Sequence, residues 1–202
     1  MKRVLPIALL FVVLGSTFAA VKSGEQAPPF TATDSNGKSH KLADFKGKYV
    51  VLEWTNSGCP FTRKHYSTGN MQKLQKEWTS KGVTWLSVLS SAPGKEGYKT
   101  AAEENAYIKD ANASPTAVLL DPSGDLGHLF GAKTTPHMFV IDPNGKVIYA
   151  GAIDDKPSTR ESDVASAKNY VAAALTEAMA GKPVSVTSSQ AYGCSVKYAQ
   201  GD

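Results

Sequence analysis

The sequence is poor in cysteine and in net charge. Only two cysteines, Cys59 and Cys194, occur among its 202 residues, and they can form one structural disulfide, one redox pair or two separate thiols. The formal charge of +4 is too small for the basic surface of a nucleic-acid-binding protein. Internal repeats and low-complexity linkers are also absent, so the chain is expected to form one domain.

The sequence also lacks an apolar run long enough to span a membrane. Two basic residues precede the apolar residues 4–14, and small residues ending in Ala19 and Ala20 follow, which predicts a signal peptide over residues 1–20. The apolar run is shorter than the ~20 residues of a membrane helix, so cleavage and release are favoured over anchoring. No cysteine follows the run, which disfavours a lipoprotein anchor. We therefore expect a periplasmic or secreted protein.

The residues that are present predict alternating strands and helices. Runs rich in β-branched and aromatic residues predict two short strands within residues 30–41 and further strands at residues 49–54, 83–89, 117–120, 138–141 and 147–150. Helical patterns lie at residues 59–81, 98–110, 121–130 and 161–180. Strands joined by helical crossovers pair in parallel, while the Asn144-Gly145 turn makes a hairpin that adds an antiparallel edge. The expected fold class is α/β, with a central mixed sheet flanked by helices.

Cys59 stands where a buried strand passes into a helix. Pro60 fits the first helical turn, and Asn56 or Ser57 can cap it. Unpaired backbone N–H groups and the positive end of the helix dipole favour a thiolate there, which lowers the cysteine pKa. Arg63 lies four residues on and shares the face of Cys59, so we expect its charge to assist. The next cationic candidate, the histidine at position 65, is expected to point elsewhere.

The order of elements, the cysteine just past the first buried strand, and Thr135-Pro136 before the strand at Phe139 resemble the thioredoxin-like superfamily. The opening residues 24–30 resemble its redoxin branch, which holds peroxiredoxins of the alkyl hydroperoxide reductase and thiol-specific antioxidant type and exported cytochrome-maturation thioredoxins. The resemblance covers residues 24–180. It implies a thioredoxin-like domain over residues 21–180 with an N-terminal β-hairpin extension.

The resemblance also assigns residues around the cysteine. It implies that Pro136 is a cis-proline facing Cys59 and that Thr135, Pro136 and Trp54 shape a groove for a partner. Thr62 stands three residues after Cys59, where thioredoxins have their second cysteine, so a disulfide within a four-residue loop is impossible here. We keep Thr62 as a site residue because it occupies this position.

Two positions depart from the peroxiredoxin pattern. Peroxiredoxins have a threonine three residues before their reactive cysteine, and Asn56 stands there in this chain. They also have an arginine three residues ahead of the strand at Phe139, where this chain has Pro136. Reduction of peroxides by Cys59 is therefore an alternative rather than the leading hypothesis.

Cys194 lies in a tail, residues 181–202, of small and polar residues that can swing. It can attack an oxidised Cys59 as a resolving thiol. A permanent Cys59–Cys194 disulfide and two unpaired thiols are the alternatives. The leading hypothesis is an exported thiol-disulfide oxidoreductase with Cys59 as nucleophile and Cys194 as resolving cysteine. A non-enzymatic module that keeps the fold and has lost the chemistry is a further alternative.

No cofactor and no metal site are expected. The four histidines, at positions 40, 65, 128 and 137, lack the paired cysteines of thioredoxin-like copper chaperones. The expected partners are protein or small-molecule thiols and disulfides, with peroxide as the substrate of the alternative activity. Nucleic acid is not an expected partner, and contact with a membrane is expected only through an uncleaved signal segment.

Overall fold

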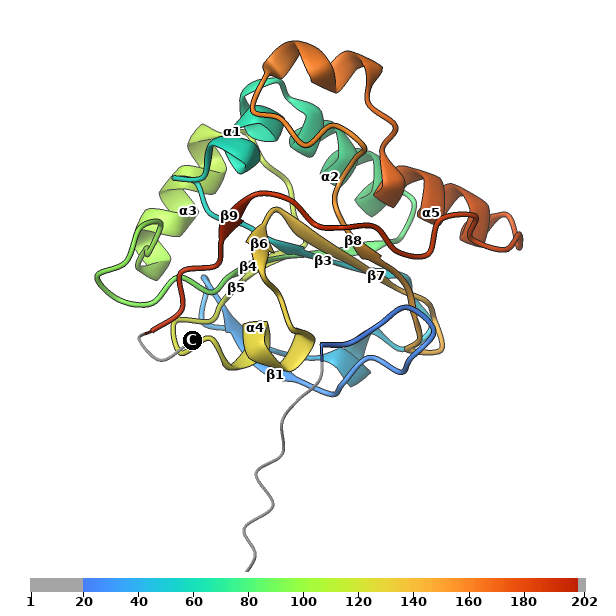
Figure 1. Cartoon of the computed structure of the whole chain (residues 1–202). Coiled ribbons are helices and arrows are strands. Elements are labelled where there is room, and N and C mark those ends of the chain that lie inside the picture. The colour runs from blue at the N-terminus through green and yellow to red at the C-terminus, as the bar shows by residue number, and fades with distance from the viewer. Residues whose placement is uncertain (1–19, 200–202) are drawn as a thin grey trace, which may run out of the picture.

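A computed structural model of the chain describes residues 20–199, so the predicted signal peptide lies outside the described residues except for Ala20. A seven-stranded sheet runs through the middle of the molecule in the order β2-β1-β5-β4-β3-β7-β8 (Figure 1). Its strands are β1 (Thr31–Asp34), β2 (Ser39–Lys41), β3 (Val50–Trp54), β4 (Thr84–Leu89), β5 (Ala117–Leu120), β7 (His137–Ile141) and β8 (Val147–Gly151).

The pairing of the strands confirms the predicted mixed sheet. Strands β3, β4 and β5 are parallel, whereas β7 pairs antiparallel with both β3 and β8. At the far edge, β1 pairs antiparallel with β5 and with β2, which is the expected N-terminal hairpin. The fold class is therefore α/β with a central mixed sheet flanked by helices.

Helices cover both faces of the sheet. Figure 1 shows α1 (Pro60–Ser67), α2 (Asn70–Ser80), α3 (Ala101–Asp110) and α5 (Tyr170–Met179) above the sheet and α4 (Asp125–Phe130) below it. Two 3-10 turns, η1 (Leu42–Phe45) and η2 (Glu161–Ser166), complete the helical elements of the described chain. None of the helices within residues 20–199 has the length and apolar character needed to cross a membrane.

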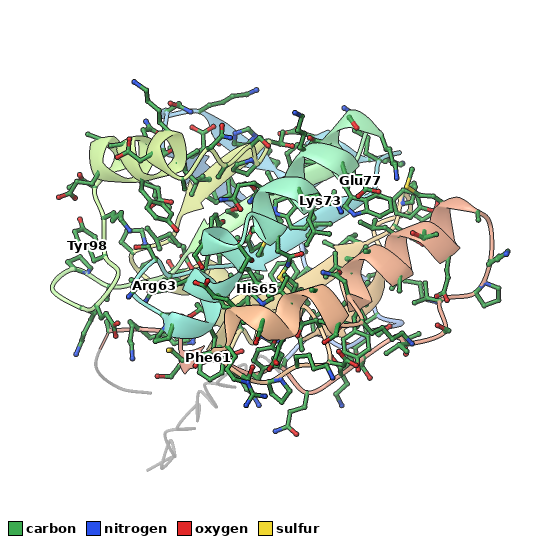
Figure 2. The ribbon with its side chains drawn as sticks, turned by 90° about the horizontal axis from the view of Figure 1, so that it is seen from above. Phe61, Arg63, His65, Lys73, Glu77 and Tyr98 are labelled. Atoms are coloured by element: carbon green, nitrogen blue, oxygen red, sulfur yellow. The ribbon has the colours of Figure 1, made fainter. Side chains whose placement is uncertain are left out.

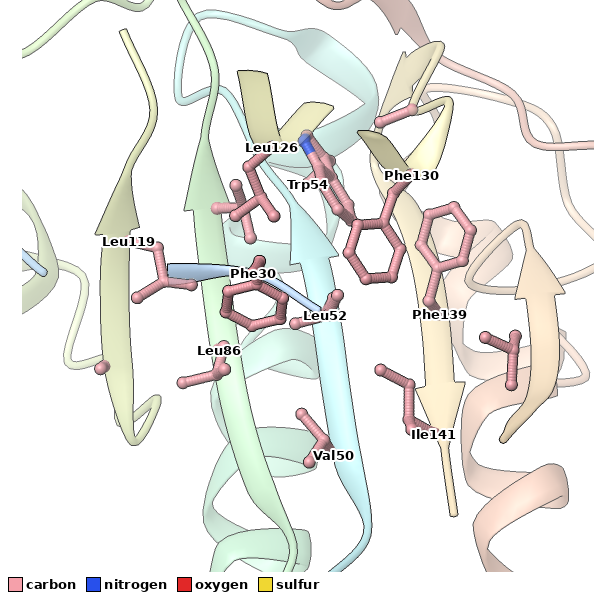
Figure 3. Packing of buried hydrophobic residues seen from close by; sticks show 14 of the residues in the cluster. Phe30, Val50, Leu52, Trp54, Leu86, Leu119, Leu126, Phe130, Phe139 and Ile141 are labelled. Carbon is pink, nitrogen blue, oxygen red and sulfur yellow. The ribbon is translucent and has the colours of Figure 1, made fainter. Parts of the chain in front are cut away.

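The side chains of the central strand β3 alternate between the two faces of the sheet, so they contribute to a separate apolar core on each face. Leu52 and Trp54 pack on the α4 side with Phe130 and Phe139 (Figure 3). Val51 packs on the other side, against α2 and α5. A strand buried on both faces is rigid, and its carboxyl end leads straight into the loop that carries Cys59.

Two predicted helices are interrupted. The helix expected over residues 59–81 is two helices, because Gly69 takes the left-handed conformation at φ 73° and ends α1 before α2 begins. The helix expected over residues 161–180 begins as η2, and α5 starts after Asn169, whose side chain accepts a hydrogen bond from the backbone N–H of Ala172 at 2.8 Å.

The tail forms part of the fold. A two-stranded sheet joins β6 (Thr134–Thr135) to β9 (Cys194–Ser195), with Cys194 opposite Thr135 in an antiparallel register. We call residues 187–198 the strap. In Figure 1 the strap crosses beside β6 at the end of the sheet where α1 begins. Main-chain pairing and side-chain packing thus hold the strap against the fold in this structure.

Candidate active site

Cys59 is the N-cap residue of α1, and Pro60 occupies its first turn. The loop before it is a tight turn made by Asn56. The side-chain Oδ1 of Asn56 accepts from the backbone N–H of Gly58 at 2.8 Å, and its backbone carbonyl accepts from the N–H of Cys59 at 3.0 Å. The predicted start of the helix is confirmed, but Cys59 itself is the N-cap residue, and neither Asn56 nor Ser57 caps α1 through its side chain. Cys59 therefore sits where backbone N–H groups are free to face its sulfur.

The Cys59 sulfur lies between β6 and the strap. Its Sγ–H donates to the carbonyl oxygen of Thr135 at 3.0 Å, and the backbone N–H of Cys194 donates to the sulfur at 3.4 Å. The Thr135-Pro136 peptide bond is cis, as the resemblance implies. Both cysteines are free thiols, and Cys59 has no exposed surface whereas Cys194 is partly exposed. The structure thus brings together two cysteines that lie far apart in the chain.

The two thiols have opposite shifts in pKa. Burial raises the pKa of the Cys59 thiol, but hydrogen bonds from the Cys194 side chain and from the backbone N–H groups of Thr62 and Cys194 outweigh burial and leave that pKa below its usual value. Burial and the neighbouring Cys59 sulfur raise the pKa of Cys194 to about 12. In the reduced pair Cys59 therefore ionises first, and Cys194 keeps the proton that it donates to the Cys59 thiolate.

One side of the strap is held against α1 by Tyr192. Its hydroxyl donates to the buried carboxylate of Asp154, and its ring packs against the ring of Phe61, with 5.8 Å between the centroids. The ammonium of Lys64 lies 5.4 Å from the centre of the same ring. Phe61 and Tyr192 each lie two residues from a cysteine, so this contact fixes the spacing of the two thiols.

The other side of the strap is held by the chain near α4 and β6. The N–H of Val196 donates to the carbonyl of Lys133 at 3.1 Å, and the Val196 side chain joins the core cluster that contains Trp54. The Tyr198 hydroxyl donates to the carbonyl of Ala132 at 2.7 Å. Cys194 is therefore fixed from both directions along the chain.

The remaining predicted site residues have different surroundings. Thr62 is fully buried, and within residues 20–199 its hydroxyl finds no hydrogen-bond partner. Arg63 is exposed on the side of α1 that faces Tyr98 (Figure 2), and its charge is not among the causes that lower the pKa of Cys59. Trp54 is fully buried in the core, with its indole N–H donating to Ser90 at 3.0 Å.

A buried polar cluster beneath α1 was not predicted from the sequence. Lys64 and His65 are both buried there, and Lys64 donates to the carbonyl of Lys156 at 3.0 Å. His65 Nε2 lies 3.8 Å from the Asp154 carboxylate, so this side chain points away from Cys59, as expected. Burial lowers the pKa of His65 to about 4. Asp154 thereby links α1 to the strap through Tyr192.

A second buried polar group that the sequence analysis missed is Glu53 in β3, on the α2 side of the sheet. Burial raises the pKa of its carboxyl, although four neutral donors face it. These donors are Trp85 at 2.7 Å, Tyr66 at 2.9 Å, Ser87 at 3.0 Å and Gln75 at 3.2 Å. These hydrogen bonds connect β3 to β4, α1 and α2. Glu53 therefore helps to hold in place the strand that leads to Cys59.

The described residues contain no group of three or more histidine, cysteine or acidic side chains arranged to hold a metal ion. Of the histidines, His40 bonds to the Asp34 carboxylate at 2.7 Å, and His128 stacks on Tyr198 with 4.0 Å between the centroids.

Comparison with known proteins identifies the family of the chain. Residues 23–150 match the AhpC/TSA family. The chain belongs to this family. It is 30% identical over 125 residues to the thiol-disulfide oxidoreductase ResA of Bacillus thuringiensis subsp. konkukian, a match that covers 62% of this chain and 66% of the relative, slightly less than two thirds of its length. The ResA of Bacillus subtilis is 29% identical over 148 residues, 72% of this chain and 77% of the relative.

Solved structures of other proteins share the fold. A crystal structure of a hypothetical protein from Sinorhizobium meliloti superposes with a TM-score of 0.75 at 22% identity over 91% of this chain and 98% of the other. A putative thiol:disulfide interchange protein DsbE from Chlorobium tepidum gives a TM-score of 0.52 at 28% identity over 65% of this chain and 85% of the other. The first likeness extends over most of the chain.

Proposed function

We propose that this protein is a thiol-disulfide oxidoreductase in which Cys59 is the nucleophile and Cys194 the resolving cysteine. The observation that carries the proposal is the contact between them, in which the backbone N–H of Cys194 lies 3.4 Å from the Cys59 sulfur. The names of the ResA relatives support the reaction class. The lowered pKa of Cys59 supports its role, because a thiolate is the attacking species in disulfide exchange.

The two cysteines perform a two-step exchange. The Cys59 thiolate attacks one sulfur of a partner disulfide, which forms a mixed disulfide and releases the partner's other sulfur as a thiolate. Cys194 then gives up its proton and attacks the Cys59 sulfur, which releases the first partner sulfur and leaves a Cys59–Cys194 disulfide. The partner gains two electrons and the two cysteine protons, and the pair is oxidised.

Access to Cys59 requires movement of the strap, because Cys59 has no exposed surface in the reduced protein. The strap is held there by noncovalent contacts alone, and its strand β9 has only two residues. A protein partner can therefore lift it by pairing with β6 in its place. Thr62 assists by directing its backbone N–H at the sulfur, and Arg63, being exposed, contributes only a screened charge.

Capture of the mixed disulfide tests the proposal. A Cys194→Ser variant mixed with a disulfide-containing peptide is expected to stall with the peptide bound to Cys59, whereas the wild-type protein releases the peptide and forms a Cys59–Cys194 bond. Both products are identified by non-reducing peptide mapping. A Cys59→Ser variant that reduces the peptide as fast as the wild type would refute the assignment of the nucleophile.

We also propose that the protein is exported, on the strength of the signal-peptide pattern in residues 1–20. An oxidising compartment suits a pair of cysteines that cycles through a disulfide. The intact mass of the protein isolated from its native compartment is expected to match a chain that begins after Ala19 or Ala20. A mass that includes Met1-Lys2-Arg3 would contradict export with cleavage.

A further inference from the structure

The two sulfurs of the pair differ in their access to solvent. Cys59 has no exposed surface, whereas Cys194 is partly exposed beside Glu96 and Lys197 at the rim of the strap. The ammonium of Lys197 lies 3.7 Å from the Glu96 carboxylate, and the two charges have opposite effects on the pKa of Cys194. A thiolate that approaches from solvent therefore meets Cys194 before it meets Cys59.

Oxidation of the pair strengthens this difference. In the reduced protein the strap is held by noncovalent contacts on either side of Cys194, through Tyr192 and through Val196. A Cys59–Cys194 bond adds a covalent tie between those two anchors. The strap then cannot be lifted from Cys59, because the bond to be broken is the one that holds the strap over the sulfur.

We propose that the reducing partner attacks the oxidised pair at Cys194, and that Cys59 is the leaving group. This inference rests on the proposed function, and it concerns the half of the cycle that restores the thiols. A partner thiolate forms a bond to the Cys194 sulfur, the Cys194–Cys59 bond breaks, and its electron pair goes to Cys59. The reducing partner thus bonds only to Cys194 in the strap, and Cys59 exchanges only with Cys194 in this half of the cycle.

The chemistry of the leaving group favours the same direction. Disulfide exchange is faster when the departing thiolate has the lower pKa. Cys59 departs as a thiolate that the backbone N–H groups of Thr62 and Cys194 stabilise, and these donors remain when the Cys194 sulfur is bonded to the partner. Attack at Cys59 would instead expel Cys194, whose thiolate is disfavoured by burial.

The partner must carry two thiols. After the first step it is bound to Cys194, and its second thiolate attacks its own sulfur in that mixed disulfide. The partner's disulfide closes, Cys194 leaves as a thiolate and takes up a proton, and the pair has gained the two electrons that the partner has lost. The partner class is therefore a dithiol with one cysteine presented at its surface.

Glutathione, which has a single thiol, is a probe for the sulfur that is attacked. The full-length oxidised protein is mixed with glutathione, quenched with acid at early times and mapped without reduction by mass spectrometry. Most of the adduct is expected on Cys194 with Cys59 free, in at least about a tenfold excess over the opposite product, as a 1.4 kcal/mol difference in barrier gives. Cys59→Ser and Cys194→Ser variants loaded with glutathione disulfide confirm that each adduct is detected equally well.

The outcomes separate the two proposals. Adduct mainly on Cys59, starting from protein that contains the Cys59–Cys194 bond, overturns this inference and leaves the proposed function intact. Protein that contains no such bond after mild oxidation overturns both.

Discussion

At the scale of single residues, the site works through the unequal environments of two identical side chains. Cys59 gains hydrogen-bond donors from the start of α1 and from the strap, whereas Cys194 gains a neighbouring thiolate. The same contact thus lowers one pKa and raises the other. The proposal that Cys59 is the nucleophile rests on this asymmetry, and not on the residue type.

Replacement of Cys194 by alanine is expected to raise the pKa of Cys59, because the Cys194 side chain is the strongest of the groups that lower it. Titration of the reduced protein, followed by the ultraviolet absorbance of the thiolate, measures the change. Ser195→Ala is the matched control, since the Ser195 side chain is exposed in the same strand. An unchanged midpoint in the Cys194→Ala variant would show that the strap thiol has no part in activating Cys59.

His65 is expected to make the protein sensitive to acid. Burial, opposed in part by Asp154, lowers its pKa from 6.5 to about 4, so the folded state binds fewer protons than the unfolded state between these values. Stability is then complete above pH 6.5 and falls as the pH drops towards 4, by up to about 3 kcal/mol for such a shift.

A His65→Gln variant is expected to lose less stability than the wild type between pH 7 and pH 4.5, as measured by urea unfolding. The exposed His128 provides the control, and a His128→Gln variant should retain the acid response of the wild type. Parallel curves for the wild type and the His65→Gln variant would rule out His65 as the source.

At the scale of elements, the strap depends on close approach of its backbone to β6. Gly193 has a φ of 141°, and a Cβ atom at this position would clash with the carbonyl oxygen of Thr135. Only glycine tolerates both the conformation and the approach. The residue before Cys194 therefore decides how near the strap comes to Cys59.

Gly193→Ala is expected to displace the strap, at a cost of about 1–3 kcal/mol in the free energy of unfolding. Cys59 should then react faster with iodoacetamide in the reduced protein, and the Cys59–Cys194 disulfide should form more slowly under a fixed oxidant. Ala191→Gly, which changes the same segment without adding a Cβ atom, is the comparison. Equal alkylation rates in wild type and Gly193→Ala would mean that the strap does not shield the thiol.

Element boundaries illustrate what local sequence encodes. The helix start at Cys59 was predictable because Pro60 and the Asn56 turn act within a few residues. The break at Gly69 and the new start at Asn169 were not predicted, although glycine and asparagine are common residues at helix ends. Helical periodicity on both sides of each break hid it, since apolar spacing continues across a short interruption.

At the scale of the whole molecule, the Cys59–Cys194 bond would join the start of α1 to β9 in the C-terminal strap. Closing a loop of over a hundred residues removes entropy from the unfolded chain and contributes up to about 5 kcal/mol in the chain-entropy model. The oxidised protein is therefore expected to unfold at a higher urea concentration than the reduced protein. A Cys194→Ser variant should unfold at the same urea concentration with and without reductant, and a wild-type protein with no difference would contradict the pairing.

The sequence by itself determined the strands, the helix start at Cys59 and the family, because alternation, capping and the Thr135-Pro136 motif depend on neighbours in the chain. It left open whether Cys59 and Cys194 meet, and it suggested Arg63 and Trp54 as site residues where the structure has a solvent-exposed side chain and a core side chain. Only the tertiary structure brought the strap to β6, because a two-residue strand carries no periodicity that predicts its partner. The contact depends instead on anchors at Tyr192 and Val196 that meet residues remote in sequence, and such packing has no local signature.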